Sequence, residues 1–218
     1  MENTVMEFPD GIVMRCLSPS VTEAELYTTI VDLQPIANKA EASRGANYLS
    51  TIFKITTADK YILLTSDSEV ATFKRLVAED IHKNLYIKEL NICQLSHHGS
   101  IKNYHPPFWD YVRRGNSPQA VVSAGLNATN KHPHLDVLIN FHNQGYKILS
   151  TNIVYGMAQY FEHLKSLSKI TAKLDSFTDL EAAHTGGDKS FDLSCYFIRV
   201  ILLAYLRQLV LLSIEAKL

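Results

Sequence analysis

Apolar and polar residues alternate along the segment YLSTIFKITTADKYILLTS (48–66), and this alternation predicts a β-hairpin. A Thr-Ala-Asp-Lys turn divides the segment, and the near-continuous apolar run YILLT after it is typical of a buried strand. Similar short apolar runs predict further strands at 11–19, 89–96, 119–125 and 146–151.

Three segments carry helical signals. Residues 68–84 place apolar side chains at the period of an amphipathic helix. Residues 106–115 begin with two prolines and end on a glycine, and residues 134–145 also end on a glycine, as helices do. Residues 20–46 are mixed and polar, and we expect a loop there with room for one short helix.

The order of these elements predicts the fold class. Strands that alternate with helices over residues 48–151 indicate an α/β domain with helices packed on a sheet. The alternation ceases near residue 157, and two helices joined by HTGGDKS (184–190) are expected to follow. We therefore expect a domain over residues 1–157 and a helical extension over residues 158–218.

The composition is that of a folded protein without a strongly charged surface. Hydrophobic residues make up 46% of the 218 residues and charged residues 20%, which excludes a disordered chain. A formal net charge of -1 gives no global field for nucleic acid, although a local basic groove stays open. Cys16, Cys93 and Cys195 are odd in number and lack a Cys-x-x-Cys pair, which favours reduced thiols in the cytoplasm.

We expect no membrane span. The N-terminus, MENTVMEFPDGIVM, has acidic residues and a proline where a signal peptide needs basic and apolar residues. The most apolar stretch, residues 195–214, is interrupted by Arg199 and Arg207, so no run reaches the roughly 18–20 apolar residues of a span. We interpret this stretch as a buried or partner-docking helix, with a membrane-surface helix as the alternative. The whole chain is expected to be soluble and cytoplasmic.

Candidate chemistry gathers where predicted strands end. Asp67 follows the apolar run LLTS, the adjacent His97 and His98 follow ELNICQLS, and His132 and His134 precede the helix predicted at 134–145. The ends of neighbouring strands in an α/β sheet open onto one crevice. We therefore expect these three segments to face the same edge of the sheet.

A carboxylate with several imidazoles is a ligand set that zinc or another borderline divalent ion prefers. Such an ion supports hydrolysis at neutral pH, and two ions would stabilise both the attacking and the leaving oxygen. Gly99 permits close approach of the backbone, and Ser100 with its N–H could hold a phosphate or carboxylate oxygen.

Each feature also has a purely structural interpretation. Asp67 can be a helix cap, and His132-Pro133-His134 can be a turn before a helix. Adjacent histidines have less structural reason, because neighbouring side chains on a strand point to opposite faces and both must be satisfied. The remaining histidines fit surface or packing positions: His82, His105, His142, His163 and His184.

The segments YLSTIFKITTADKYILLTSDSE, LNICQLSHHGS and AVVSAGLNATNKHPHLDVLINFHNQGYKILSTNIVYG carry a family resemblance. Together they resemble the C-terminal half of a metallo-β-lactamase-fold hydrolase, of the subgroup associated with competence and DNA uptake. The resemblance covers roughly residues 45–157 and implies part of an αββα sandwich. It rests on an LLTSD strand end, an HHGS loop, an HPH segment and a closing Thr…Gly strand, in this order.

The resemblance implies roles for five residues. Asp67 would be a metal ligand that could bridge two ions, and His97 would be the second ligand. His98 or His134 would act in catalysis by assisting the leaving group. His132 would lie at the rim and contact the substrate. Zinc is the expected metal, with manganese as the alternative.

The sequence also departs from the family pattern. Ser66 stands where the family has a glycine, and the family's main metal motif, His-x-His-x-Asp-His, is absent from these residues. The chain therefore resembles a domain that begins midway. Two protein ligands fall short of the three that a catalytic zinc usually has. Either the remaining ligands come from a complementing subunit or a homo-oligomer, or the chain is a truncated gene product; both interpretations stay open.

Three hypotheses remain open. The first is a metal-dependent hydrolase domain for phosphodiester or nucleic-acid substrates, incomplete or inactive as a single chain. The second is a non-catalytic binding or assembly module, a pseudoenzyme that docks a partner through its C-terminal helix. The third is a general α/β domain with surface histidines, and it predicts that replacing Asp67 and His97 together changes neither metal content nor partner function.

Overall fold

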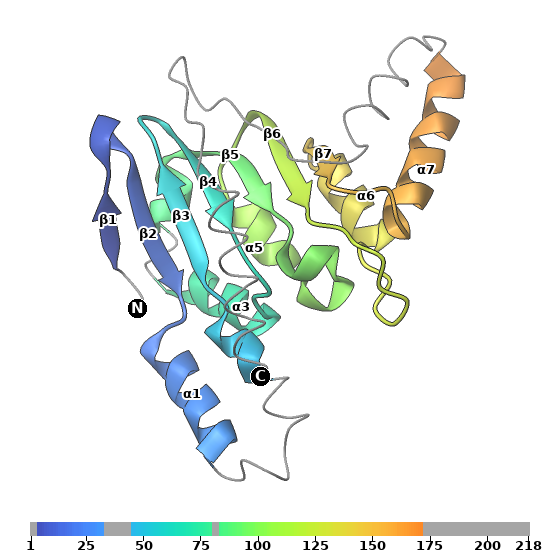
Figure 1. The fold of residues 1–218 in the computed structure, drawn as a ribbon. Coiled ribbons are helices and arrows are strands. Elements are labelled where there is room, and N and C mark those ends of the chain that lie inside the picture. Colours follow the sequence, from blue (N-terminus) through green and yellow to red (C-terminus); the bar gives the residue numbers. More distant parts are fainter. Residues whose placement is uncertain (1–3, 33–44, 80–82, 172–218) are drawn as a thin grey trace. The chain divides into compact units, whose positions relative to one another are not determined.

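The computed structural model describes residues 4–32, 45–79 and 83–171, which belong to the unit Met1–Thr185. Its centre is a seven-stranded sheet in which the strands stand in chain order (Figure 1). The bounds of the strands are β1 Val5–Glu7, β2 Val13–Ser18, β3 Ile52–Thr56, β4 Lys60–Leu64, β5 Glu89–Gln94, β6 Arg114–Val122 and β7 Lys147–Ser150.

The sheet is mixed. Strands β1 to β4 pair antiparallel, and β4 to β7 pair parallel. The predicted hairpin at 48–66 is confirmed as β3 and β4, with Phe53 opposite Leu64. The predicted α/β class is therefore confirmed.

Helices connect the parallel strands. Their bounds are α3 Val70–Ala78 and α4 Lys83–Ile87 before β5, α5 Pro106–Tyr111 before β6, and α6 Leu135–Asn143 before β7. Helix α7, Gly156–Thr171, follows β7 and packs on α6. Crossovers between parallel strands are right-handed, and β4 to β7 follow one another in the sheet in chain order. The connecting helices therefore lie on one face of the sheet, and Figure 1 shows α5 and α6 behind it.

Aromatic side chains fill the space between the helices and the sheet. The ring of Phe73 from α3 lies 4.8 Å from that of Phe108 in α5, and the ring of Trp109 lies 4.8 Å from that of Phe141 in α6. All four side chains are buried. The opposite face of the sheet is apolar at its centre, where the paired Ile62 and Ile92 are each 3% exposed.

Two elements differ from their predicted bounds. Residues 20–46 contain the helix α1, Val21–Asp32, which at 12 residues is longer than the short helix we expected. Strand β6 begins at Arg114, not at residue 119, and α5 accordingly ends at Tyr111. The register with β5 shifts between Leu90 and Ile92, so Gly115 and Pro118 lie in a bulge and end no element.

Other predictions are met in part. Helix α3 ends at Ala78 because Glu79 takes an extended conformation, so the helix predicted at 68–84 is confirmed over 70–78. Cys93 is a buried free thiol, and the Cys16 thiol donates to the Ser18 carbonyl. The helical extension is described only as far as Thr171, and its boundary near residue 157 stays a prediction. Cys195 and the apolar stretch 195–214 lie outside the described residues.

Candidate functional site

The three segments that the sequence singled out meet at one edge of the sheet. Strands β4 and β5 are parallel, so their carboxyl ends lie together, and Asp67 and His97 follow directly after them. The ring of His97 lies 5.5 Å from that of His132, which belongs to the segment before α6. Sequence reasoning therefore predicted this convergence correctly.

His98 is the histidine that faces Asp67. Its Nε2 lies 3.9 Å from Oδ1 of Asp67, and both side chains are partly exposed. On the other side of the ring, Nδ1 donates to the carbonyl of Ser123 over 2.8 Å. Because a carbonyl only accepts, Nδ1 carries a proton, and Nε2, which faces the carboxylate, is the nitrogen whose lone pair can bind a cation. Metal-binding histidines are commonly oriented in this way.

His97 takes a different position from the one we expected for a ligand paired with Asp67. Its Nδ1 is buried and has no hydrogen-bond partner among the described residues. Its ring lies between two others, 6.0 Å from that of His98 and 5.5 Å from that of His132. The geometry thus favours His98 over His97 as the partner of Asp67, and a metal role for His97 stays a prediction.

His132 and His134 contact each other directly. Their Nδ1 atoms are 3.1 Å apart, which is a hydrogen bond when one of the two carries a proton. The Ile101 N–H donates to Nδ1 of His134 over 3.4 Å, so that atom is the acceptor and His132 is the donor. The neutral pair therefore presents a lone pair on Nε2 of His132 and an N–H on Nε2 of His134.

The surroundings of His132 hold its ring neutral. Burial, and after it the neighbouring His134, His97 and His98, lower the pKa of His132 to about 4, although Asp67 acts in the opposite direction. At neutral pH the ring of His132 is therefore uncharged and can accept a proton. An imidazole with a pKa this far below 7 is a weak base on its own, and its lone pair suits a metal ligand.

Ser100 is less accessible than we expected. It is 3% exposed, and its N–H donates to the carbonyl of His97 over 3.1 Å. The backbone N–H that we expected to hold a substrate oxygen is thus already used. A role for the Ser100 hydroxyl in substrate binding stays a prediction.

Backbone strain concentrates around the cluster. Ser66, His97, His98 and Lys131 have φ of 50°, 48°, 57° and 53°, in the left-handed region that glycine favours. Each such residue costs about 1 kcal/mol, and strained residues of this kind gather at functional sites. Ser66 is the position where the resembled family has a glycine, which explains in physical terms why a glycine fits there.

Two glycines enclose the His-Pro-His segment. A Cβ on Gly99 would come within 2.8 Å of Pro133 Cβ, and a Cβ on Gly156 would come within 2.6 Å of the Leu135 nitrogen. The N–H of Gly156 donates to the Pro133 carbonyl, and the carbonyl of Gly99 accepts from the His134 N–H, both over 3.0 Å. The position of both imidazoles therefore depends on residues without side chains.

The cluster fits half of a zinc site. Two ligands of one tetrahedral zinc lie about 3.4 Å apart, close to the 3.9 Å between His98 and Asp67. Within residues 4–32, 45–79 and 83–171, no group of three or more His, Cys, Asp or Glu side chains is arranged to hold a metal ion. A complete metal centre would need ligands from outside these residues.

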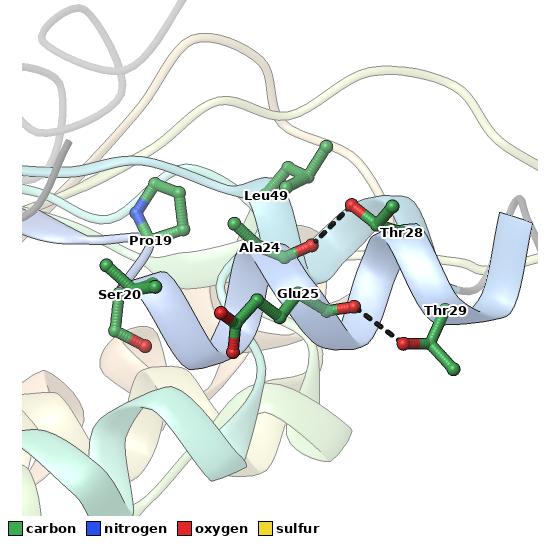
Figure 2. A pocket seen from close by; sticks show the side chains of 8 residues that line it. Pro19, Ser20, Ala24, Glu25, Thr28, Thr29 and Leu49 are labelled. Carbon is green, nitrogen blue, oxygen red and sulfur yellow. Dashed lines mark hydrogen bonds between the residues drawn. The ribbon is translucent and has the colours of Figure 1, made fainter. Parts of the chain in front are cut away.

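A cavity lies away from the site histidines. It measures about 500 Å³ and lies beside α1, as Figure 2 shows, with Pro19, Ala24 and Leu49 in its wall. The hydroxyls of Thr28 and Thr29 donate to carbonyls of their own helix (Figure 2). None of the site histidines lines this cavity, and it offers no catalytic group beyond an exposed carboxylate.

No described helix is both long and apolar enough to cross a membrane. Compared with protein-family models, with curated proteins and with solved structures, the chain gives no match.

Proposed function

We propose that this domain supplies part of a metal-dependent hydrolase centre of the metallo-β-lactamase type, which acts on phosphodiester or nucleic-acid substrates and is completed by ligands from another chain. The observation that carries the proposal is the orientation of His98. The Ser123 carbonyl takes its N–H, and its other nitrogen faces the carboxylate of Asp67 at 3.9 Å. A carboxylate beside an imidazole lone pair is an arrangement that a divalent cation stabilises.

In this proposal Asp67 and His98 hold the cation, with zinc as the expected metal and manganese as the alternative. When bound, the cation supplies Lewis-acid chemistry at neutral pH. The His132–His134 pair relays the proton. Nε2 of His132 accepts a proton from the attacking water while its Nδ1–H passes to Nδ1 of His134, and the N–H on Nε2 of His134 is donated to the leaving oxygen. The 3.1 Å contact between the two Nδ1 atoms couples these two steps.

The absence of a third ligand among the described residues favours a second candidate function. In that reading the domain keeps the scaffold as a non-catalytic binding or assembly module. The two candidates differ in what the site does, because only the hydrolase requires Asp67 and His98 to bind a cation.

A metal titration separates them. The metal-free full chain is titrated with zinc and with manganese in competition with a fluorescent chelator, as wild type and as Asp67→Asn, His98→Gln and His97→Gln. We expect one weak site per chain, weakened at least tenfold by Asp67→Asn and by His98→Gln. His97→Gln tests the alternative ligand, since it removes the adjacent imidazole and leaves the Asp67–His98 pair intact.

Two results would count against the hydrolase proposal. Wild type that shows no saturable binding would favour the assembly module. Binding that survives both Asp67→Asn and His98→Gln would place the metal elsewhere. Hydrolysis of bis(p-nitrophenyl) phosphate by the loaded chain, lost in both variants, would show that no second polypeptide is needed.

A further inference from the structure

We propose that Asn103 is a positioning residue for Asp67: its carboxamide, with the hydroxyl of Ser96, holds the turn that aims Asp67 at His98. The inference rests on the proposed function, because that function gives the direction of Asp67 its importance. It assigns a role to a buried polar network that neither the metal nor the proton steps use.

The Asp67 side chain does not hold its own position. It is 44% exposed, and its 3.9 Å separation from Nε2 of His98 is too long for a hydrogen bond. A carboxylate with this freedom points where its main chain directs it. The direction of Asp67 therefore depends on what fixes the peptides on its two sides.

Both flanking carbonyls are held by the segment that carries the histidines. The carbonyl of Ser68 accepts from Oγ of Ser96 over 2.7 Å and from Nδ2 of Asn103 over 3.0 Å. The carbonyl of Ser66 accepts from the His97 N–H over 3.0 Å and from Oγ of Ser96 over 3.3 Å. These contacts tie the turn to residues 96, 97 and 103, and the single hydroxyl proton of Ser96 is shared between the two carbonyls.

The strand before the turn is fixed in the same way. Oε1 of Gln94 accepts from the N–H groups of Thr65 and Ser66 over 3.2 and 3.1 Å. The hydroxyl of Thr65 donates to the Gln94 carbonyl over 2.9 Å. The end of β4 and the end of β5 therefore move as one unit.

Asn103 completes this network from inside the protein. Asn103 and Ser96 are 4% and 7% exposed, and Ser68 is fully buried, so water does not replace a lost donor easily. The N–H of Asn103 donates to the carbonyl of Ser100 over 3.1 Å, which anchors it to the loop that also carries His98. One residue thereby sets the separation between the two groups of the site.

The first test needs no metal. Histidine ring resonances of the metal-free protein are recorded by NMR for wild type, Asp67→Asn, Asn103→Ala and the double variant. Asp67→Asn should shift the His98 Hε1 resonance, because the carboxylate faces that ring. We expect this shift to fall at least twofold in the Asn103→Ala background, since the turn no longer aims Asp67 at His98. An equal shift in both backgrounds would overturn the positioning role.

The second test measures the zinc affinity of the same proteins. We expect Asn103→Ala to weaken it about tenfold, as loss of an outer hydrogen bond to a ligand does elsewhere. The matched control is Tyr61→Phe, which removes one buried bond to the Leu85 carbonyl at the opposite end of β4. It should lower stability and leave both the affinity and the ring resonances unchanged.

The two tests separate the two proposals. If the wild-type protein binds no zinc, the proposed function is overturned. The NMR measurement of the metal-free protein then still tests whether Asn103 positions Asp67. Equal effects of Asn103→Ala and Tyr61→Phe on affinity would reduce Asn103 to a general stabilising residue and overturn its positioning role. If Asn103→Ala does not fold, Asn103→Ser replaces it in both tests. Serine keeps a hydrogen-bond donor, but its shorter side chain places that donor farther from the Ser68 carbonyl.

Discussion

Gly156 donates its N–H to the carbonyl of Pro133 over 3.0 Å, and this contact brings the start of α7 against the His-Pro-His segment. A Cβ at residue 156 would come within 2.3 Å of that same carbonyl oxygen. The separation is shorter than real Cβ contacts allow, so backbone must move to admit any side chain.

Gly156→Ala should therefore displace His132 and His134 and destabilise the fold by about 3 kcal/mol. Urea unfolding measures the stability, and NMR of the histidine rings measures the displacement. Gly145→Ala is the matched control, because residue 145 has φ of 86° but open space around its Cβ position. It should cost about 1 kcal/mol and leave the ring resonances unchanged. Equal effects of the two changes would show that crowding at residue 156 is unimportant.

The pKa of His132 should respond to its neighbour. Burial is the largest cause of its lowering to about 4, and His134 is the next. His134→Gln removes a group that gains positive charge, so the pKa of His132 should rise from about 4 toward its ordinary value of 6.5 without reaching it. NMR titration of the His132 ring measures this shift. His163→Gln on α7 should leave it unchanged, and a pKa that stays at about 4 in His134→Gln would contradict the coupling.

Glu23 connects α1 to α3 through a buried network. Its carboxylate accepts from the Ser20 N–H over 2.7 Å and from the Thr72 hydroxyl over 2.7 Å, and it pairs with Arg75 at 3.1 Å. Burial alone would raise the pKa of Glu23, but these bonds outweigh it and leave the pKa below 4.5. Glu23→Gln should lower the free energy of unfolding by about 2–3 kcal/mol at pH 7.

The contribution of Glu23 to the free energy of unfolding also depends on pH. A lowered carboxyl pKa contributes stability that is present above about 4.5 and is lost as the pH falls through the lower folded value. Glu23→Gln should therefore reduce the acid sensitivity of unfolding as well as the stability. Glu25→Gln, on the exposed side of the same helix, is the control and should change neither.

Lys54 stabilises the fold less at neutral pH than an apolar residue would. It is 5% exposed and lies 4.7 Å from the centre of the Tyr61 ring. Burial, and after it the charges of Lys88 and Arg15, lower its pKa from 10.5 to about 8. The buried charge of Lys54 therefore destabilises the folded state below about pH 8, and this destabilisation falls as the amine loses its proton above that pH.

The contribution of Lys54 to the stability should therefore rise between about pH 8 and 10.5, where its amine loses its proton in the folded state before it does in the unfolded state. Lys54→Met should remove this rise and raise the stability at pH 7 by about 1–3 kcal/mol. Unfolding in urea at pH 7 and pH 10 measures both effects. A variant that is less stable at pH 7 would show that the contact with the Tyr61 ring outweighs desolvation.

Most of the sheet could be predicted from the sequence. Successive side chains of a strand point to opposite faces, so a strand with a buried face shows a regular pattern of apolar residues. The start of β6 could not. Gly115 and Pro118 are typical of the end of an element, and only pairing with β5 shows that they lie in a bulge. Helix α1 was underestimated for a related reason, since its threonines and polar residues lack a clear apolar stripe.

The convergence of the site could also be predicted, because parallel strands end at the same edge of a sheet. The pairing within the site could not. His97 and His98 both take positive φ, and this backbone turn decides which imidazole meets Asp67. The partners that orient the site, such as the Ser123 carbonyl and the Asn103 carboxamide, leave no pattern in the sequence, because any residue has a carbonyl and a single asparagine has many uses.

The order of the strands has a consequence for how the chain reaches this structure. Every strand of the sheet pairs with the one that precedes it in the chain, so no strand waits for a distant partner. As the polypeptide leaves the ribosome, β4 can join a meander already formed by β1 to β3, and each later strand adds to a completed edge. His97 and His98 follow β5, so the antiparallel strands and β5 are synthesised before them.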